Sequence, residues 1–333
     1  MTNSALVVDP ELGREISEQL ALIDAELYQA TQYADRFAQT TAQHLIAAGG
    51  KRLRPLVTLL AAQLGDPSRA EVISAAVVVE LTHLATLYHD DVMDSAPLRR
   101  GAPAAHEVWG NQVAILTGDL LFARASAIVA KLGPQAVLIQ AETFERLCLG
   151  QLHETIGPEK DADPVTHYMQ VLADKTGSLI ATAARFGALL SGADERTQQV
   201  MTQYGEQIGL AFQLADDVLD LSADPAATGK TPGTDLREHV PTMPVLLLRQ
   251  LVGSGQATAA DVALLTKLDG DLSSDEVLAT VVAELRDHPV VTQTTNLARS
   301  HAQQAAETLA ELPPSTVRTE LSNLANLVVD RHK

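Results

Sequence analysis

The sequence has a single cysteine, Cys148, among 333 residues. An intramolecular disulfide is therefore impossible, and the apolar neighbours of Cys148 predict a core residue. Aromatic residues are also scarce, at 3%. Strands favour aromatic and β-branched residues, whereas alanine, leucine, glutamine and glutamate, which are abundant here, are good helix formers. The composition therefore predicts a mainly helical protein.

Basic residues are few. Lysine and arginine together number 24 against 42 aspartates and glutamates, which gives a formal net charge of -18. Nucleic acids and anionic membranes need a basic footprint, so neither is expected as a standing partner. A phosphorylated substrate would need a local cluster of cations to offset this overall charge.

Long apolar runs are missing as well. No stretch approaches the roughly 18 uninterrupted apolar residues of a membrane span, so none is expected. The first residues, MTNSALVVDPELGREI, lack a basic region followed by a long apolar stretch, which argues against a secretory signal. We therefore expect a cytoplasmic protein. Its hydrophobic content of 46% is ample for a large core.

Helical periodicity extends along most of the chain. We expect helices over residues 11–48 with a break near 29–33, and over 56–64, 68–94, 105–132, 135–156, 166–190, 195–221 and several stretches after 244. Ser68 and Glu71 match a capping box, and Gly49-Gly50 a helix end. A bend is expected near 175–177, a break at Pro313-Pro314, and a long loop or lid over 222–244. No stretch predicts a strand. The predicted fold is one large all-α domain, 1–333, with a loose tail at 1–10.

Two stretches end in the same arrangement of aspartates, LTHLATLYHDDVMD at 81–94 and FQLADDVLD at 212–220. The first motif is Asp90, Asp91 and Asp94, and the second motif is Asp216, Asp217 and Asp220. On a helix, positions i, i+1 and i+4 fall within an arc of roughly 100° and rise about 6 Å. All three carboxylates of each motif therefore leave one face of its helix.

One acidic cluster alone is usually a solvated surface. Here the spacing recurs, with the same valine after the second aspartate, and each motif follows a mostly apolar run that is expected to be buried. Unpaired carboxylates at this density repel one another and are costly to bury. Mg²⁺ removes that cost, because it takes oxygen ligands and is shared between carboxylates and substrate phosphates. We therefore predict two facing clamps for Mg²⁺ and a diphosphate.

Basic residues that could bind a diphosphate lie in four stretches: GGKRLRP at 49–55, LRRG at 98–101, DKTG at 174–177 and TGK at 228–230. Arginine suits bidentate phosphate contacts and lysine acts as a point charge. Each stretch alone is a weak signal, since most lysines and arginines are simply surface residues. Arg99 and Arg100 closely follow Asp94, which puts them beside the first motif.

With these motifs the chain resembles the trans-isoprenyl diphosphate synthases, or polyprenyl synthetase family, over nearly its whole length. GGKRLRP, HDDVMD followed by LRRG, DKT and FQLADDVLD occur in that family's order and at its approximate separations. The resemblance implies long helices around a deep central cavity, usually in a homodimer, with the two motifs facing across its mouth. It implies a Mg²⁺-dependent prenyltransferase that condenses isopentenyl diphosphate with an allylic diphosphate.

The resemblance also implies roles for individual residues. The isopentenyl diphosphate would be held by Lys51, Arg54, His83 and Arg100. The principal Mg²⁺ ligands would be Asp90, Asp94 and Asp216, supported by Asp91, Asp217 and Asp220. The allylic diphosphate would meet Arg99, Lys175 and Lys230, and the developing allylic cation would meet Thr176 and Gln213. Gln151 and Glu154 would face the cavity.

Two histidines illustrate the alternatives. His83 lies on an apolar helix, where a histidine is more often a core residue; the resemblance favours the ligand role. His89, beside Asp90, is interpreted as a structural residue. The sequence departs from the family in the lid, where many members have a second lysine and this chain reads DLREHVPTMP. His239 lies in that region and is a candidate substitute for that lysine.

Product length depends in this family on side-chain bulk one turn before the first motif. Ala85 and Thr86 occupy that place, and both are small, so a medium or long all-trans product is predicted. A short-chain synthase making geranylgeranyl or farnesyl diphosphate is the main alternative. A terpene cyclase would not need GGKRLRP or LRRG, and the two intact motifs speak against a regulatory subunit of a two-chain synthase.

Overall fold

The computed structural model describes residues 7–222 and 232–330. The chain forms two compact units whose segments alternate along the sequence. Unit 1 comprises Met1–Arg146, Ser178–Gly205 and Thr308–Leu324, and unit 2 comprises Leu147–Gly177, Glu206–Glu307 and Ala325–Lys333. The boundaries include points inside two helices, α7 (Pro134–Ile156) and α10 (Glu195–Ser222). The single domain expected from the sequence stays a prediction.

Unit 1 is helical, as predicted, and contains the first parts of α7 and α10. Its other elements are α1 (Pro10–Ala30), α2 (Arg36–Ala47), α3 (Leu53–Ala62), α4 (Ala70–Met93), α5 (Ala105–Trp109), α6 (Asn111–Val129), α9 (Ser178–Leu190), the 3-10 turn η3 (Leu309–Glu311) and most of α17 (Thr316–Leu327). The expected break after residue 29 separates α1 from α2, and Gly49 follows the end of α2 with a φ of 83°.

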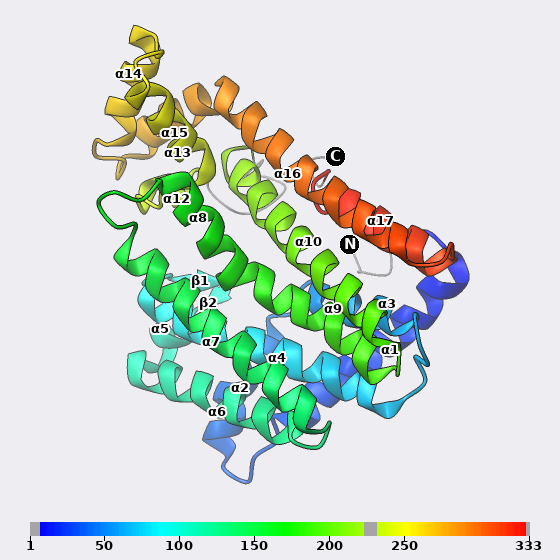
Figure 1. Cartoon of the computed structure of the whole chain (residues 1–333). Helices are drawn as coiled ribbons and strands as arrows, with labels where there is room; N and C mark the ends of the chain where they lie inside the picture. The colour runs from blue at the N-terminus through cyan, green and yellow to red at the C-terminus, as the bar shows by residue number, and fades with distance from the viewer. Residues whose placement is uncertain (1–6, 223–231, 331–333) are drawn as a thin grey trace. The chain divides into compact units, whose positions relative to one another are not determined.

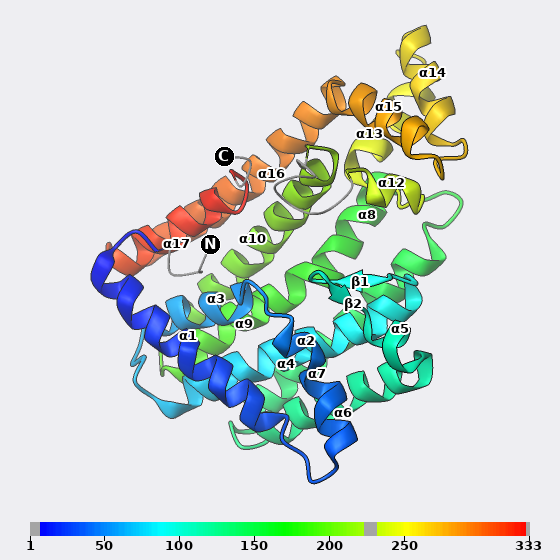
Figure 2. The same ribbon diagram turned by 180° about the vertical axis from the view of Figure 1, so that it is seen from behind.

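Helix α4, which carries the first motif, lies at the centre of unit 1. It contacts α1, α3, α6 and α9. Figure 1 shows it running beside α6, and Figure 2, from the opposite side, shows α1 and α2 in front. Its residues from Ala75 to Thr82 are all buried, because the run AAVVVELT is apolar on every side apart from Glu80 and Thr82.

Two helices of unit 1 are long and apolar enough to cross a membrane by length and composition. The apolar window of α4 is 61% buried, as in the core helix of a water-soluble protein. The window of α6 is only 33% buried, and its Ile115 and Leu116 are 42% and 65% exposed. The absence of a membrane span stays a prediction.

A small antiparallel hairpin follows the first motif, where no strand was predicted. β1 (Leu98–Arg99) pairs with β2 (Ala102–Pro103), Leu98 opposite Pro103 and Arg99 opposite Ala102. Arg100 and Gly101 between them have φ angles of 54° and 77°, the left-handed conformation that a two-residue hairpin turn requires. The hairpin fixes the backbone of both arginines of LRRG.

Unit 2 contains the rest of α7 and α10 and the remaining helices. These are α8 (Pro164–Leu172), the π-helical turn η2 (Ala173–Gly177), α12 (Thr234–Arg237), α13 (Met243–Gly253), α14 (Ala259–Leu268), α15 (Asp275–Arg286) and nearly all of α16 (Pro289–Thr308). The π-helical turn lies at the predicted bend. The buried core of unit 2 includes the side chains of Leu221, Leu248, Leu272, Leu278 and Leu285.

Two local predictions were wrong. Cys148 is exposed, because its neighbour Leu147 faces inward and the next helical position turns outward. Ser68 does not cap α4; its amide and hydroxyl donate to Asp66 instead, and Arg69 is the N-cap. The loose tail expected at 1–10 falls mostly outside the described residues; at its end the amides of Val8 and Asp9 each donate to the carboxylate of Glu320 at 2.9 Å.

Candidate active site

The first motif lies at the C-terminal end of α4, with Asp94 as the C-cap. Asp90 is half-buried and Asp94 is exposed, whereas Asp91 is fully buried. Arg99 of the hairpin donates to Oδ1 of Asp91 from Nε at 2.6 Å and lies 2.5 Å from it through Nη2. Burial raises the pKa of Asp91, and Arg99 opposes that rise. Oδ2 of Asp91 is buried and has no hydrogen-bond partner within the described residues.

A cluster of cations surrounds His83, about two helical turns before Asp90. Burial lowers the pKa of His83 well below its usual range, and the charges of Arg54, Arg100, Arg99 and Arg52 lower it further. Burial also lowers the pKa of Arg54 to about 10, with Glu80 opposing and Arg100 adding to the shift. Nε of Arg54 is buried without a hydrogen-bond partner in the described part of the chain. This unsatisfied donor in a cationic cluster is suited to an anion.

The structure thus brings together Arg54, His83 and Arg100, three of the four residues predicted to hold isopentenyl diphosphate. Lys51, the fourth, is exposed. The guanidinium of Arg100 donates to the backbone oxygens of Leu45, at 3.2 Å, and of Gly49. These two backbone oxygens hold the guanidinium of Arg100 against the C-terminal end of α2.

Glu80 organises this cluster and was missed from the sequence. Its carboxylate, 2% exposed, accepts a hydrogen bond from Nη1 of Arg52 at 2.9 Å and lies 4.0 Å from Nη2 of Arg100. Arg52 also donates to Asp24 at 2.7 Å. A glutamate inside the apolar run AVVVELTHL was the available signal, since a charge is rarely buried without a partner.

The second motif lies near the C-terminal end of α10 in unit 2. Asp216 and Asp220 are half-buried, and Asp217 is 2% exposed. Oδ2 of Asp217 accepts hydrogen bonds from the hydroxyl of Tyr168 at 2.9 Å and the amide of Met243 at 3.1 Å. Burial raises the pKa of Asp217 to about 8, and these two bonds oppose that rise. The backbone oxygen of Asp220 accepts from the amide of Gly233 at 2.9 Å.

Both motifs therefore divide their carboxylates in the same way. The middle aspartate is buried and bonded within its own unit, whereas the first and third are more accessible. No group of three metal-binding side chains is already gathered within residues 7–222 and 232–330. The oxygen donors nevertheless fit a divalent ion, because Mg²⁺ commonly takes one or two carboxylates and completes its shell with water and substrate phosphates.

The π-helical turn η2 presents the other predicted residues of unit 2. Nζ of Lys175 donates to Oε2 of Glu154 at 2.5 Å, and the hydroxyl of Thr176 donates to Oε1 of Gln213 at 3.2 Å. A Cβ on Gly209 would come within 2.5 Å of the Cα of Gly177, so glycine at position 209 lets α10 approach the turn. Thr176 and Gln213, both predicted beside the allylic cation, are hydrogen-bonded partners.

Four further residues complete the predicted set. Lys230 lies outside the described residues. His239 is exposed, and its charge acts on Asp271, which gives no support to a role as a lid cation. Gln151 has a buried Oε1 without a hydrogen-bond partner in the described segments. His89 bonds through Nε2 to the backbone oxygen of Ile115 at 3.1 Å, and its supporting role stays a prediction.

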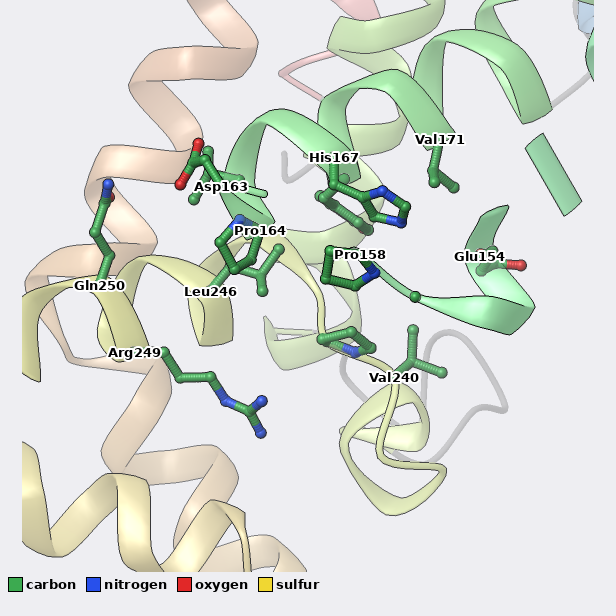
Figure 3. A pocket seen from close by; sticks show the side chains of 14 residues that line it. Glu154, Pro158, Asp163, Pro164, His167, Val171, Val240, Leu246, Arg249 and Gln250 are labelled. Carbon is green, nitrogen blue, oxygen red and sulfur yellow. The ribbon is translucent and has the colours of Figure 1, made fainter. Parts of the chain in front are cut away.

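Unit 2 also contains a cavity of about 390 Å³, lined mostly by apolar side chains. Figure 3 shows His167 and Val171 of α8 and Leu246 and Arg249 of α13 around it. Tyr168, the partner of Asp217, is another lining residue. No residue of α4 is among its lining residues. The deep central cavity implied by the resemblance stays a prediction, as does the facing of the two motifs.

Comparison with known proteins decides the family. The model of the family named polyprenyl synthetase matches residues 35–284. The chain belongs to the polyprenyl synthetase family. It is 44% identical over 313 residues to the nonaprenyl diphosphate synthase of Mycobacterium tuberculosis, covering 93% of this chain and 90% of that protein.

Two other relatives bear on the activity of this polyprenyl synthetase. The crystal structure of geranylgeranyl pyrophosphate synthase from Corynebacterium glutamicum, complexed with calcium and isoprenyl diphosphate, is 40% identical with a TM-score of 0.86, covering 98% of both chains. Heptaprenyl diphosphate synthase component 2 of Geobacillus stearothermophilus is 33% identical, covering 93% of this chain and 95% of that protein. The relatives thus differ in product length and in subunit composition.

The residues predicted to set product length lie on α4 of this polyprenyl synthetase. Ala85 is 2% exposed, and its carbonyl oxygen lies close to Gly118 of α6, where an added Cβ would be 3.1 Å away. Thr86 is half-buried, and its hydroxyl donates to the backbone oxygen of His83 at 2.8 Å. Thr86 therefore has more free space around it than Ala85.

Proposed function

We propose that this polyprenyl synthetase is a Mg²⁺-dependent polyprenyl diphosphate synthase that condenses isopentenyl diphosphate with an allylic diphosphate. The observation that carries the proposal is the matching division of the two motifs, each with accessible first and third aspartates around a buried, bonded middle one. The separate arginine cluster around His83 supports a second diphosphate site. Two anionic substrates require two such sites in one enzyme.

The proposed reaction begins when the carbon–oxygen bond of the allylic diphosphate breaks. Bound Mg²⁺ would supply positive charge that stabilises the leaving diphosphate. Asp90, Asp94 and Asp216 would be the principal ligands of the metal, with Asp91, Asp217 and Asp220 in support. Lys175 and Arg99 would offset the remaining charge, and Lys230 is assigned the same role from the resemblance. The paired Thr176 and Gln213 would direct oxygen atoms towards the allylic cation.

Arg54, His83 and Arg100, together with Lys51, would bind the diphosphate of isopentenyl diphosphate. Its double bond then attacks the allylic cation, so a carbon–carbon bond forms and a neighbouring carbon loses a proton. The departing diphosphate is the proposed acceptor of that proton, which fits the motifs, since they offer no obvious protein base. An apolar cavity would exclude water, which would otherwise quench the cation.

The proposed product is a medium or long all-trans polyprenyl diphosphate. Small residues at Ala85 and Thr86 support it, and so does the similarity to a nonaprenyl diphosphate synthase. A geranylgeranyl-length product is the second candidate, favoured by the 40% identity to a geranylgeranyl pyrophosphate synthase. Incubation with labelled isopentenyl diphosphate and Mg²⁺, followed by chromatography of the products, separates the two. Products that stop at the geranylgeranyl length would overturn the longer assignment.

We further propose a cytoplasmic homodimer built from single-domain chains. The exposed apolar residues Val108 of α5 and Ile115 and Leu116 of α6 support the dimer, because α5 and α6 are in contact and such a patch is typical of an interface. The similarity to component 2 of a heptaprenyl diphosphate synthase makes a two-chain enzyme the alternative. Turnover by the purified chain alone would exclude that alternative.

A further inference from the structure

Tyr168 lies outside every sequence motif and yet bonds directly to the second motif. It belongs to α8 and is 8% exposed. Its hydroxyl donates to the carboxylate of Asp217 and lies 3.1 Å from Oδ1 and 2.9 Å from Oδ2. The amide of Met243, at the start of α13, supplies a second donor. The carboxylate of Asp217 is thus held from two helices other than its own.

These bonds fix the end of α10 in orientation. Asp217 directly follows Asp216 and precedes Asp220 by three residues, so rotation of α10 that frees Asp217 would also move both accessible carboxylates. A buried carboxylate that loses a donor pays the desolvation cost of the unsatisfied oxygen. The bond therefore opposes such rotation more strongly than a bond on the surface would.

One side of Tyr168 borders open space. The cavity of about 390 Å³ is lined by Tyr168 together with Val171 and Leu246, and Figure 3 shows the latter two side chains at its wall. A side chain beside an open space lacks packing partners on that side. The hydroxyl bond to Asp217 adds a directional contact to the packing on the other sides of the ring.

We propose that Tyr168 is a positioning residue for the second motif: by holding Asp217 it orients Asp216 and Asp220 towards the metal and the allylic diphosphate. The proposal rests on the proposed function. It assigns Tyr168 no contact with substrate. Removal of its hydroxyl should weaken the metal-dependent binding of a diphosphate while leaving the fold intact.

The structure offers a matched control in Tyr204. Its hydroxyl is also buried and donates to the backbone oxygen of Leu321 at 2.7 Å, a bond within unit 1 that involves neither motif. Tyr168→Phe and Tyr204→Phe each delete one buried hydroxyl and one hydrogen bond. Both variants are expected to lose a comparable amount of stability. A difference between them in the Mg²⁺ concentration needed for stabilisation would therefore come from the position of the second motif and not from a general loss of stability.

The test measures thermal unfolding of the whole protein with inorganic diphosphate as Mg²⁺ is added. For Tyr168→Phe we expect the Mg²⁺ concentration at half-maximal stabilisation to rise about fivefold, as loss of one ordinary buried hydrogen bond predicts. Tyr204→Phe should keep the wild-type concentration. Equal Mg²⁺ dependence in both variants would overturn the proposal. If the wild-type protein gains no stability from Mg²⁺ and diphosphate, the proposed function itself is wrong.

A double-mutant cycle with Asp217→Asn separates action through Asp217 from a general effect. If Tyr168 acts through Asp217, adding Tyr168→Phe to Asp217→Asn should cause little further loss of Mg²⁺-dependent stabilisation. Fully additive losses would contradict the assignment. The wild-type KM for isopentenyl diphosphate should persist in Tyr168→Phe, because its binding residues lie elsewhere in the sequence.

Discussion

At the scale of single residues, both candidate sites depend on contacts between side chains from distant parts of the sequence. The resemblance to the family assigned Thr176 and Gln213 to one place and Arg54, His83 and Arg100 to another, and the members of each set lie together in the structure. Glu80 and Tyr168 could not be predicted so directly. Tyr168 reaches Asp217 across 49 positions of sequence, and only the tertiary fold brings such residues together.

Glu80 gives a stability prediction at this scale. Glu80→Gln removes the charge that faces Arg52 and Arg100 in a buried site, so the free energy of unfolding should fall by about 3–5 kcal/mol. Glu71→Gln is the matched control on the same helix, because Glu71 is 46% exposed and lies 3.9 Å from Arg69. Its change should stay within about 0.5 kcal/mol. Denaturant unfolding measures both, and equal effects would contradict the role assigned to Glu80.

Helices explain why most boundaries could be predicted and some could not. The glycine pair at 49–50, the bend at 175–177 and the break near Pro313 depend on local chemistry, and all three are present. The hairpin at 98–103 was missed because strands of two residues leave no alternating pattern to read. The cap of α4 was misassigned because Asp66 competes for Ser68.

The approach of α10 to the π-helical turn gives a prediction for an element. Gly209→Ala should displace Gly177 and the turn that carries Lys175 and Thr176, because the new Cβ would lie 2.5 Å from the Cα of Gly177. We expect kcat to fall by about tenfold or more, as for other small misplacements of catalytic groups. Gly253→Ala in α13 has no atom within 4 Å of its new Cβ and should keep wild-type kcat. Steady-state assays compare the two, and an active Gly209→Ala enzyme would refute the inferred packing.

Helix α4 carries the prediction for product length. Thr86→Phe should shorten the product, because a bulky side chain one turn before Asp90 would block the growing chain. Ala85→Tyr should do the same, but overpacking at this buried position should also cost about 1–3 kcal/mol of stability. Chromatography of the products from both variants checks this, with a melting curve to record the stability cost. An unchanged product ladder would show that another residue sets the length.

At the scale of the whole molecule, the sequence predicted an all-α protein, and the family comparison agrees. It did not predict the division into two compact units, since the segments of each unit come from distant parts of the chain. Helix α6 is the clearest case of an incomplete element, because two-thirds of its apolar window is not buried within the chain.

The exposed face of α6 predicts a dimer. Replacing both Ile115 and Leu116 by lysine should convert the dimer to a monomer, because the apolar contact is lost and charge is introduced. Val262→Lys on α14 is the control, since Val262 is 47% exposed and lies in unit 2. Light scattering after size-exclusion chromatography measures the mass. A wild-type monomer would contradict the proposed interface, and insolubility relieved only by detergent would indicate a membrane contact instead.

The central claim is that the accessible aspartates of both motifs hold the metal for one reaction. Turnover of labelled isopentenyl diphosphate by Asp90→Asn and Asp216→Asn, as a function of Mg²⁺, tests it most directly, with exposed Asp287→Asn as the control. We predict that each motif variant loses about 10²–10³-fold in kcat, that chelation of the metal abolishes wild-type turnover, and that the control is unchanged. Near-normal turnover by either motif variant, or by the wild-type enzyme after complete removal of divalent metal, would contradict the account.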